Sequence, residues 1–205
     1  MSLYPEVQRK AQNELDAVLG PAILSTFADR PRLPYIEALV KESLRWHTVA
    51  PVGIPHMCTK DDIYEGLRIP GSAIVMANIW AFTHDPEIYP NPEVFDPTRF
   101  LLSTQKEAQP DPHNLTFKFG RRTCPGRILA DSTIFMSIAL SLAVFDIRPG
   151  AEKSSKVEFL PGVISHPGPF NLRITPRSKE HEELVRRVEV DFPFEEGHAE
   201  SLNDV

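Results

Sequence analysis

Cys124 stands in a setting that favours chemistry at its sulfur. It lies between Gly120 and Gly126, beside basic residues and just before an apolar stretch with helical character. Glycines allow backbone turns that other residues avoid, so amide N–H groups can point at the sulfur. A helix N-terminus and nearby arginine charges both favour the thiolate form. A thiolate in such a place is either a nucleophile or a metal ligand.

Spacing argues against several other kinds of cysteine site. A phosphatase-type loop needs an arginine six residues after the cysteine, where this chain has Ala130. Cys58, the other cysteine, is too distant in sequence to form a redox pair or a zinc knuckle with Cys124. An inert cysteine is the plain alternative, because free cysteines are often buried. The residues alone leave the choice between ligand and nucleophile open.

Two groups of charged residues upstream also have a regular spacing. Glu42 and Arg45 are three residues apart in a segment with helical periodicity, so their side chains share one face. Arg99 follows in the stretch Asp96-Pro97-Thr98-Arg99-Phe100. On its own, the pair of Glu42 and Arg45 would be an ordinary surface ion pair, which contributes little to stability.

Taken together, these patterns resemble the cytochrome P-450 family. The ten residues Phe117-Lys118-Phe119-Gly120-Arg121-Arg122-Thr123-Cys124-Pro125-Gly126 fit the haem-binding signature F-x-x-G-x-R-x-C-x-G at every fixed position. The segment from Glu42 to Arg45 is similar to the E-x-x-R motif, and the stretch ending in Arg99-Phe100 resembles the P-x-R-F motif. The resemblance implies an α+β, mainly helical fold: the C-terminal, haem-proximal portion of the cytochrome P-450 fold, with small β-sheets.

The resemblance also implies roles for single residues around a haem b group. Cys124 would be the axial thiolate ligand of the haem iron, and Arg122 and His56 would meet the haem propionates. Phe117 would pack on the proximal side and shield the thiolate. The other fixed positions of the haem-binding loop are Gly120 and Gly126.

A structural triad of Glu42, Arg45 and Arg99 is implied as well. Arg99 would join the helical pair, so that one carboxylate is held between two guanidiniums. The planar fork of arginine suits this geometry. By resemblance, the triad locks the irregular segment that supports the cysteine loop.

The implied activity is that of a haem-thiolate monooxygenase, an oxidoreductase that inserts one oxygen atom of O2 into a small lipophilic substrate. An NADPH-dependent cytochrome reductase would supply electrons, and the basic residues Lys118, Arg121 and Arg127 could meet such an acidic donor. Two alternatives are kept: a truncated, non-catalytic remnant, and a thiol or zinc enzyme unrelated to haem. Charge gives no sign of a nucleic-acid surface.

Periodicity and breakers predict the elements that position these residues. Helices are expected at Glu6 to Leu19, Tyr35 to Trp46, Ile79 to His84 (a single turn), Arg127 to Phe145 and Glu180 to Val188. Strands are expected at Ile63-Tyr64, Leu67 to Ile69, near Val157 to Ile164, and at Asn171 to Thr175. Pro70 and Gly71 have the preferred residues for the centre of a type II turn.

Charge divides the chain into two parts. Residues 178–205 contain nine acidic and three basic residues, which accounts for the whole net charge of -6. We expect residues 1–177 to form the haem-binding part, and residues 178–205 to form an acidic, flexible tail. The apolar run from Ile128 to Phe145 includes Asp131 and is expected to be a buried helix and not a membrane span.

The resemblance covers the last part of the family's length only. The long distal helix, with its acid–alcohol pair for proton delivery, has no counterpart in this sequence, and neither has the usual anchor to the endoplasmic reticulum membrane. The chain is therefore expected to be an intracellular, C-terminal fragment. An incomplete pocket should also leave apolar helix faces exposed near Tyr35 and Ile128.

Overall fold

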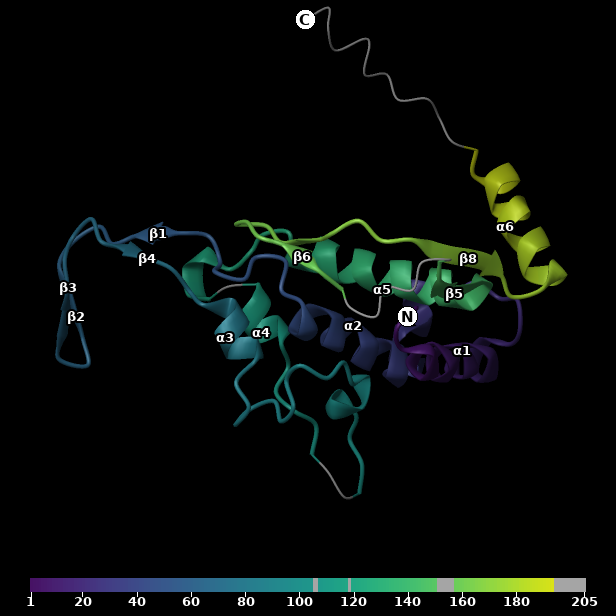
Figure 1. The fold of residues 1–205 in the computed structure, drawn as a ribbon, viewed down its shortest axis with the longest axis horizontal. Helices are drawn as coiled ribbons and strands as arrows, with labels where there is room; N and C mark the ends of the chain where they lie inside the picture. The colour runs from purple at the N-terminus through teal and green to yellow at the C-terminus, as the bar shows by residue number, and fades with distance from the viewer. Residues whose placement is uncertain (105–106, 118, 151–156, 194–205) are drawn as a thin grey trace, which may run out of the picture.

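The computed structural model describes residues 1–104, 107–117, 119–150 and 157–193, and it has the predicted α+β, mainly helical architecture. Its α-helices are α1 (Pro5–Leu19), α2 (Pro34–Trp46), α3 (Ile79–Thr83), α4 (His113–Thr116), α5 (Arg127–Val144) and α6 (Lys179–Asp191). Short 3-10 helices are η1 (Phe27–Arg32), η2 (Pro97–Phe100) and η3 (Gly120–Arg122). Figure 1 shows an elongated molecule, with a β-arm at one end and α6 at the other.

The strands pair in antiparallel twos. The arm contains β1 (His56–Met57) paired with β4 (Ile74–Val75), and β2 (Asp62–Tyr64) paired with β3 (Leu67–Ile69). The longest pair is β5 (Phe145–Pro149) with β8 (Leu172–Pro176), and β6 (Phe159–Leu160) pairs with β7 (His166–Pro167). Because β5 follows α5 directly, its pairing with β8 places residues 172–176 beside the helical body (Figure 1).

Helices α1, α2 and α5 enclose the core. In α1 and α2 the buried apolar residues follow the helical spacing that the sequence predicted: Val7, Ala11 and Leu15 in α1, and Ile36, Leu39 and Val40 in α2. The core residues of α5 are Phe135, Ala139 and Leu142. Pro5 and Pro34 begin their helices, where the missing N–H costs nothing. Glu14 of α1 also caps α2, since its carboxylate accepts from the backbone N–H groups of Tyr35 (2.7 Å) and Ile36 (2.9 Å).

The turn between β3 and β4 is shifted by one residue from the predicted position. Its closing bond runs from the N–H of Ala73 to the carbonyl of Pro70 (3.1 Å), so its centre is Gly71-Ser72. Ser72 therefore takes the left-handed conformation, with φ of 68°. The N–H of Gly71 donates to the Asp61 carboxylate at 2.8 Å. This hydrogen bond holds Gly71 in the first of the two central positions of the turn.

Helix α5 is buried over only part of its length. Phe135, Ala139 and Leu142 are in the core, whereas Ile128 and Leu129 in the first turn are 76% and 74% exposed. The expected exposed apolar face near Ile128 is thus present, but the one expected near Tyr35 is not, because Tyr35 is buried against α1. Within the described ranges, α5 is the one helix long and apolar enough to cross a membrane, by length and composition alone.

The acidic C-terminal segment begins with a packed helix. The short helix expected at Glu180 to Val188 extends over Lys179–Asp191 as α6, and its residues Leu184 and Val185 contact the core. His181 is buried near its start, and Arg177, just before it, pairs with Asp16 of α1 (Nη1 to Oδ1, 2.9 Å). Residues 194–205 of the expected flexible tail lie outside the described part of the chain, and the division at residue 177 stays a prediction.

Candidate functional site

The Cys loop, defined as Phe117 and residues 119–126, is a tight backbone winding that ends at helix α5. Gly120 opens the winding with φ of +57°, a conformation that favours glycine. The N–H of Thr123 donates to the Gly120 carbonyl (3.2 Å), and the N–H of Cys124 donates to the Phe117 carbonyl (2.9 Å). This backbone hydrogen bond between Cys124 and Phe117 closes the loop and fixes the position of the cysteine near its end. Lys118, assigned to the surface by sequence, lies outside the described residues.

The sulfur of Cys124 lies at the entrance to α5 and is partly exposed. Gly126 is the N-cap of the helix, and a Cβ added there would lie 3.9 Å from the sulfur, at van der Waals distance. The carbonyl of Cys124 accepts from the N–H of Arg127 at 3.3 Å. Glycine at position 126 therefore keeps one flank of the sulfur free of side chain, as a bulky ligand on that sulfur would need.

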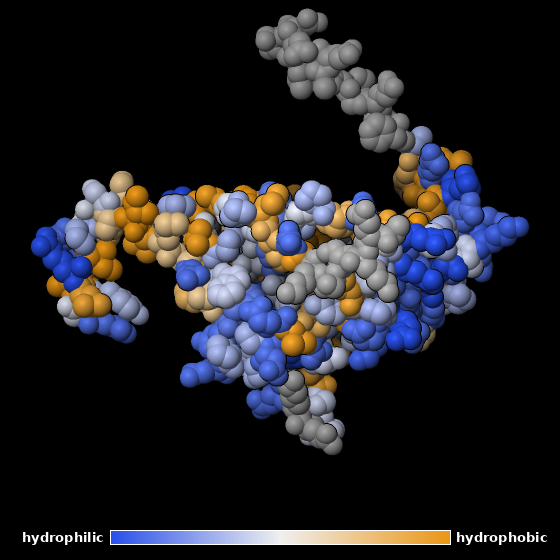
Figure 2. All heavy atoms as spheres, in the orientation of Figure 1, coloured by the Kyte–Doolittle hydropathy of each residue, from blue (hydrophilic) through white to orange (hydrophobic). Residues whose placement is uncertain are grey.

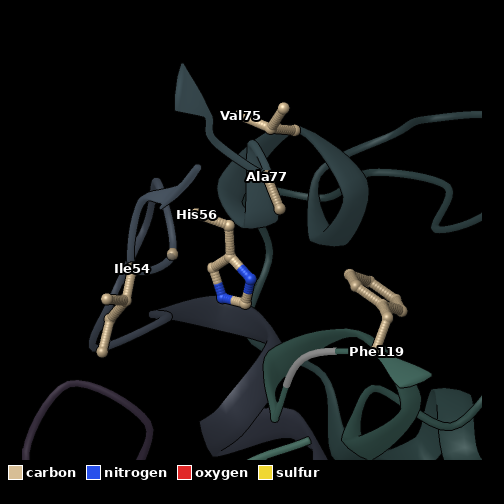
Figure 3. Close-up of a pocket in the computed structure, with 6 residues that line it drawn as sticks. Ile54, His56, Val75, Ala77 and Phe119 are labelled. Carbon is tan, nitrogen blue, oxygen red and sulfur yellow. The ribbon is translucent and has the colours of Figure 1, made fainter. Parts of the chain in front are cut away.

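A hollow of about 190 Å³ lies beside the Cys loop. It is lined by Gly53, Ile54, His56, Val75, Ala77 and Phe119. Figure 3 shows His56 of β1 and Phe119 of the Cys loop turned toward the same space. The structure thus brings His56 to the loop, although 68 residues separate it from Cys124 in the sequence. Apart from the imidazole, the lining is apolar, which suits a flat hydrophobic group with a polar edge.

The remaining residues of the haem-binding signature take different positions around the loop. Phe117 is buried, and its ring stacks on that of His113 at 5.7 Å between centroids. Gly120 and Arg122 are exposed, and Arg122 ends the short helix η3. Because Arg122 faces solvent, it is accessible to an acidic group of a ligand.

Glu42, Arg45 and Arg99 form a buried cluster. Arg45 donates two hydrogen bonds to the Glu42 carboxylate, from Nε (2.8 Å) and from Nη2 (2.9 Å). Nε of Arg99 lies 3.2 Å from Oε2 of the same carboxylate. Glu42 and Arg45 are fully buried and Arg99 is 3% exposed, so the pair is not an ordinary surface pair. One carboxylate is held between two guanidiniums, as the resemblance implied.

The same three residues hold the irregular segment that follows α3. Arg45 donates to the carbonyls of Thr83 (3.1 Å) and Val94 (3.3 Å). Arg99 donates to the carbonyls of Pro90 (3.2 Å), Asn91 (3.4 Å) and Val94 (3.0 Å), and to Oε1 of Gln109 (2.9 Å). Glu42 in turn accepts from the N–H of Asp96 at 2.8 Å. This satisfies carbonyls in a segment that lacks a sheet or helix partner for them.

Sequence reasoning missed a second charged cluster, which we call the His113 network. His113 of α4 lies between two carboxylates: Nδ1 is 2.6 Å from Oδ1 of Asp111, and Nε2 is 2.9 Å from Oδ1 of Asp131 in α5. Asp131 also makes a two-bond pair with Arg30 (2.6 and 2.8 Å). Two further members complete the network, Glu37 on Arg30 (2.8 Å) and Lys41 on Asp111 (3.0 Å).

The ionisation of the His113 network follows from these contacts. Burial lowers the pKa of His113, but hydrogen bonds and charges from Asp111 and Asp131 outweigh burial, so the net shift is upward. The Arg30 guanidinium lowers the pKa of Asp131, assisted by His113. Burial opposes the ionisation of Asp111, yet bonds from His113 and Lys41 lower its pKa overall. The Asp-x-His spacing was visible in the sequence, but Asp131 lies beyond the Cys loop and joins only on folding.

Cys124 is not part of a multi-ligand protein metal site in the described ranges. No group of three or more His, Cys, Asp or Glu side chains there could hold a metal ion. The single sulfur, the glycine-lined flank and the adjacent apolar hollow fit a haem, and they do not fit the zinc alternative.

Comparison with known proteins shows the family to which the chain belongs. Residues 1–174 match the family described as cytochrome P-450. The chain is 46% identical to the O-methylsterigmatocystin oxidoreductase of Aspergillus flavus over 99% of its length and 38% of the relative's. It is 51% identical to the cytochrome P-450 monooxygenase claR of Ampulloclitocybe clavipes over 92% of its own length and 36% of that protein's.

A solved structure has the same fold. A zebrafish cytochrome P-450, determined with abiraterone, superposes with a TM-score of 0.75 at 32% identity, covering 85% of this chain and 40% of that one. The chain thus spans about two fifths of the length of the proteins it matches. The family match over residues 1–174 includes the Cys loop, the charged triad and the His113 network.

Proposed function

Because this chain belongs to the cytochrome P-450 family, we propose that it is the haem-ligating region of a monooxygenase. The reaction would insert one oxygen atom of O2 into a C–H bond of a small lipophilic substrate. The other oxygen atom would leave as water, after two electrons and two protons have been supplied. The observation that carries the proposal is the Cys loop itself: a single partly exposed sulfur, wound by Gly120 and flanked by Gly126, beside an apolar hollow.

We assign Cys124 as the axial thiolate ligand of haem b. Bound haem supplies the oxidative chemistry, while the protein provides the ligand, the orientation and the exclusion of water. As the ligand, the cysteine sulfur would donate electron density to the iron, a property of thiolate ligands in this class. The backbone bond from Cys124 to Phe117 holds the sulfur in place, and the buried Phe117 ring packs behind the loop. Because Gly126 has no side chain, it would leave one flank of the sulfur free for the haem.

His56 and Arg122 are proposed to meet the haem propionates. His56 lines the apolar hollow and is its polar member, which suits the charged edge of an otherwise apolar group. Arg122 is exposed at the end of η3, and its guanidinium can pair with a carboxylate in two-bond geometry. Both residues would orient the haem and take no part in the oxidation.

The triad of Glu42, Arg45 and Arg99 is proposed to be a structural support for the Cys loop. Its guanidiniums bind carbonyls of the segment that leads from α3 toward α4 and the Cys loop. None of its three residues is among those that line the hollow. Loss of the triad should therefore affect folding and haem retention before it affects intrinsic chemistry.

We further propose an NADPH-dependent cytochrome reductase as the electron donor. Arg121 and Arg127 are exposed beside the Cys loop, so an acidic protein surface could approach the ligand side. Like most members of the family, the enzyme would work inside the cell at the endoplasmic reticulum membrane. Names of relatives support the class of reaction, and the substrate is proposed only as lipophilic.

The test is the reduced carbon-monoxide difference spectrum of the 205-residue chain reconstituted with haem. We expect a thiolate-type spectrum that Cys124→Ser abolishes. Cys58→Ser is the matched control, because both cysteines are free and partly exposed but Cys58 lies in the arm. A spectrum that survives Cys124→Ser and is altered by Cys58→Ser would refute the assignment. Thiolate-type haem binding without product, in the presence of a competent reductase and substrate, would favour the non-catalytic alternative.

A further inference from the structure

His113 connects both ends of the Cys loop. Its ring stacks on Phe117, the first residue of the loop, with an interplanar angle of 22°. Nε2 of the same ring lies 2.9 Å from Asp131, which is on α5 one turn beyond the end of the loop. Since Phe117 also accepts the N–H of Cys124, a continuous set of contacts runs from α5 through His113 and Phe117 to the cysteine.

The two contacts of the imidazole require a proton on each ring nitrogen. Nδ1 faces a carboxylate oxygen of Asp111 at 2.6 Å, and Nε2 faces one of Asp131 at 2.9 Å. Ionised carboxylates only accept hydrogen bonds, and a neutral imidazole donates from one nitrogen only. A neutral ring would therefore turn a lone pair toward one of the carboxylates. Only the imidazolium donates to both.

The surrounding charges balance only when His113 is protonated. The carboxylates facing it are Asp111 and Asp131, and the next groups outward are Lys41 on Asp111, Arg30 on Asp131 and Glu37 on Arg30. Three carboxylates and two cations leave one negative charge, which the imidazolium cancels. The side chain of His113 is 16% exposed, so water screens this charge only in part. The direction of the pKa shift at His113 agrees with the geometry.

We propose that His113 is a positioning residue, which clamps the Cys loop to helix α5 while its imidazole is protonated and releases it on deprotonation. His113 is not among the residues that line the hollow, and it acts through its contacts with Phe117 and Asp131. The proposal rests on the proposed function, in that the loop is taken to hold the thiolate ligand. It predicts that thiolate ligation weakens on the alkaline side, when the clamp loses its charge.

The stability of the chain without haem should show the same dependence. Because the pKa of His113 is raised in the folded state, its protonation stabilises the fold. This contribution to the free energy of unfolding is fully present below the ordinary pKa of histidine, about 6.5, and is lost as pH rises through the pKa of the folded state. Thermal unfolding of the haem-free chain across this range reports on the clamp independently of any ligand. A ring-proton NMR titration of His113 in the same sample gives its pKa directly.

The experiment compares His113→Gln with His113→Arg, with and without haem. Glutamine is neutral, so at every pH this variant should show the low thiolate-type fraction that wild type shows only at alkaline pH. Arginine keeps a permanent charge and can donate to both carboxylates, so it should retain the high fraction and lose the alkaline transition. His166→Gln, an exposed histidine on β7, is the matched control and should titrate like wild type.

A second variant keeps the proposal testable if the arginine side chain of His113→Arg does not fit between the two carboxylates. Asp131→Asn removes one charged partner, so the alkaline transition should move to lower pH. If wild type and His113→Gln share one alkaline transition, in both the haem spectrum and unfolding, the clamp is refuted. If wild type gives no thiolate-type spectrum at any pH, the proposed function fails instead, while the unfolding and NMR titrations still decide whether the clamp exists.

Discussion

Replacement of Glu42 by alanine should cost more stability than loss of any exposed charge in this chain. The Glu42 carboxylate accepts two bonds from Arg45, contacts Arg99 at 3.2 Å and accepts the N–H of Asp96. Its removal leaves two guanidiniums facing each other at positions that are 0% and 3% exposed. Breaking a buried pair by removing one partner costs about 3–5 kcal/mol. That is a large part of the roughly 5–15 kcal/mol that stabilises a typical domain.

The two arginines should differ in the size of their effect. Arg45→Ala removes both hydrogen bonds from Arg45, and Glu42 keeps only the longer contact to Arg99 and the N–H of Asp96. Arg99→Ala leaves that pair intact, but the carbonyls of Pro90 and Val94 lose a donor. We therefore expect the free energy of unfolding to fall most for Glu42→Ala, then for Arg45→Ala, and least for Arg99→Ala.

Urea denaturation followed by circular dichroism measures these differences. The matched control is Glu182→Ala, which breaks the exposed i,i+4 pair with Arg186 on α6 and should leave the midpoint unchanged. If Glu42→Ala does not fold, Glu42→Gln keeps an acceptor oxygen for Arg45 but loses the charge, and its midpoint should lie below that of wild type. A Glu42→Gln chain as stable as wild type, or a Glu42→Ala midpoint no lower than that of Glu182→Ala, would refute the reasoning.

Two local features give further predictions. Ser72→Gly should raise the free energy of unfolding by up to about 1 kcal/mol. The left-handed φ costs a non-glycine residue about 1–2 kcal/mol, and the greater chain entropy of glycine in the unfolded state offsets only part of this gain. A variant that is less stable than wild type in urea denaturation would contradict the shifted turn. Glu14→Ala should lower the free energy of unfolding by about 1–2 kcal/mol, because two N–H groups at the start of α2 lose their acceptor. Asn13→Ala, at the exposed neighbouring position, should change little, and equal melting temperatures for the two variants would contradict the cap.

The sequence alone determined the features that depend on neighbouring residues. The 3.6-residue spacing of apolar side chains, with Pro5 and Pro34 at the starts, placed α1 and α2 to within one residue. The Cys loop was recognisable for the same reason, since its glycines and cysteine act within ten residues. The arm strands β2 and β3 were also found locally, because the short turn between them sets their register.

Tertiary structure decided the features that depend on distant partners. The type of residue at position 145 suits the end of a helix and the start of a strand equally well. Phe145 is a strand residue because it pairs with Pro176 in β8. Gly71 was expected to take the left-handed position in its turn, and its bond to Asp61, ten residues away, passed that position to Ser72. In both cases a hydrogen-bond partner outside the local window outweighed local preference.

The charged clusters show the same division most clearly. Glu42 and Arg45 share a helix face in any reading, but their burial follows from the packing of the segment around Arg99, 57 residues beyond Glu42. His113 had no visible partner across the Cys loop until folding brought Asp131 to 2.9 Å. Spacing along the chain fixes which residues can share an element, whereas burial and charge pairing depend on distances that only the packed molecule sets.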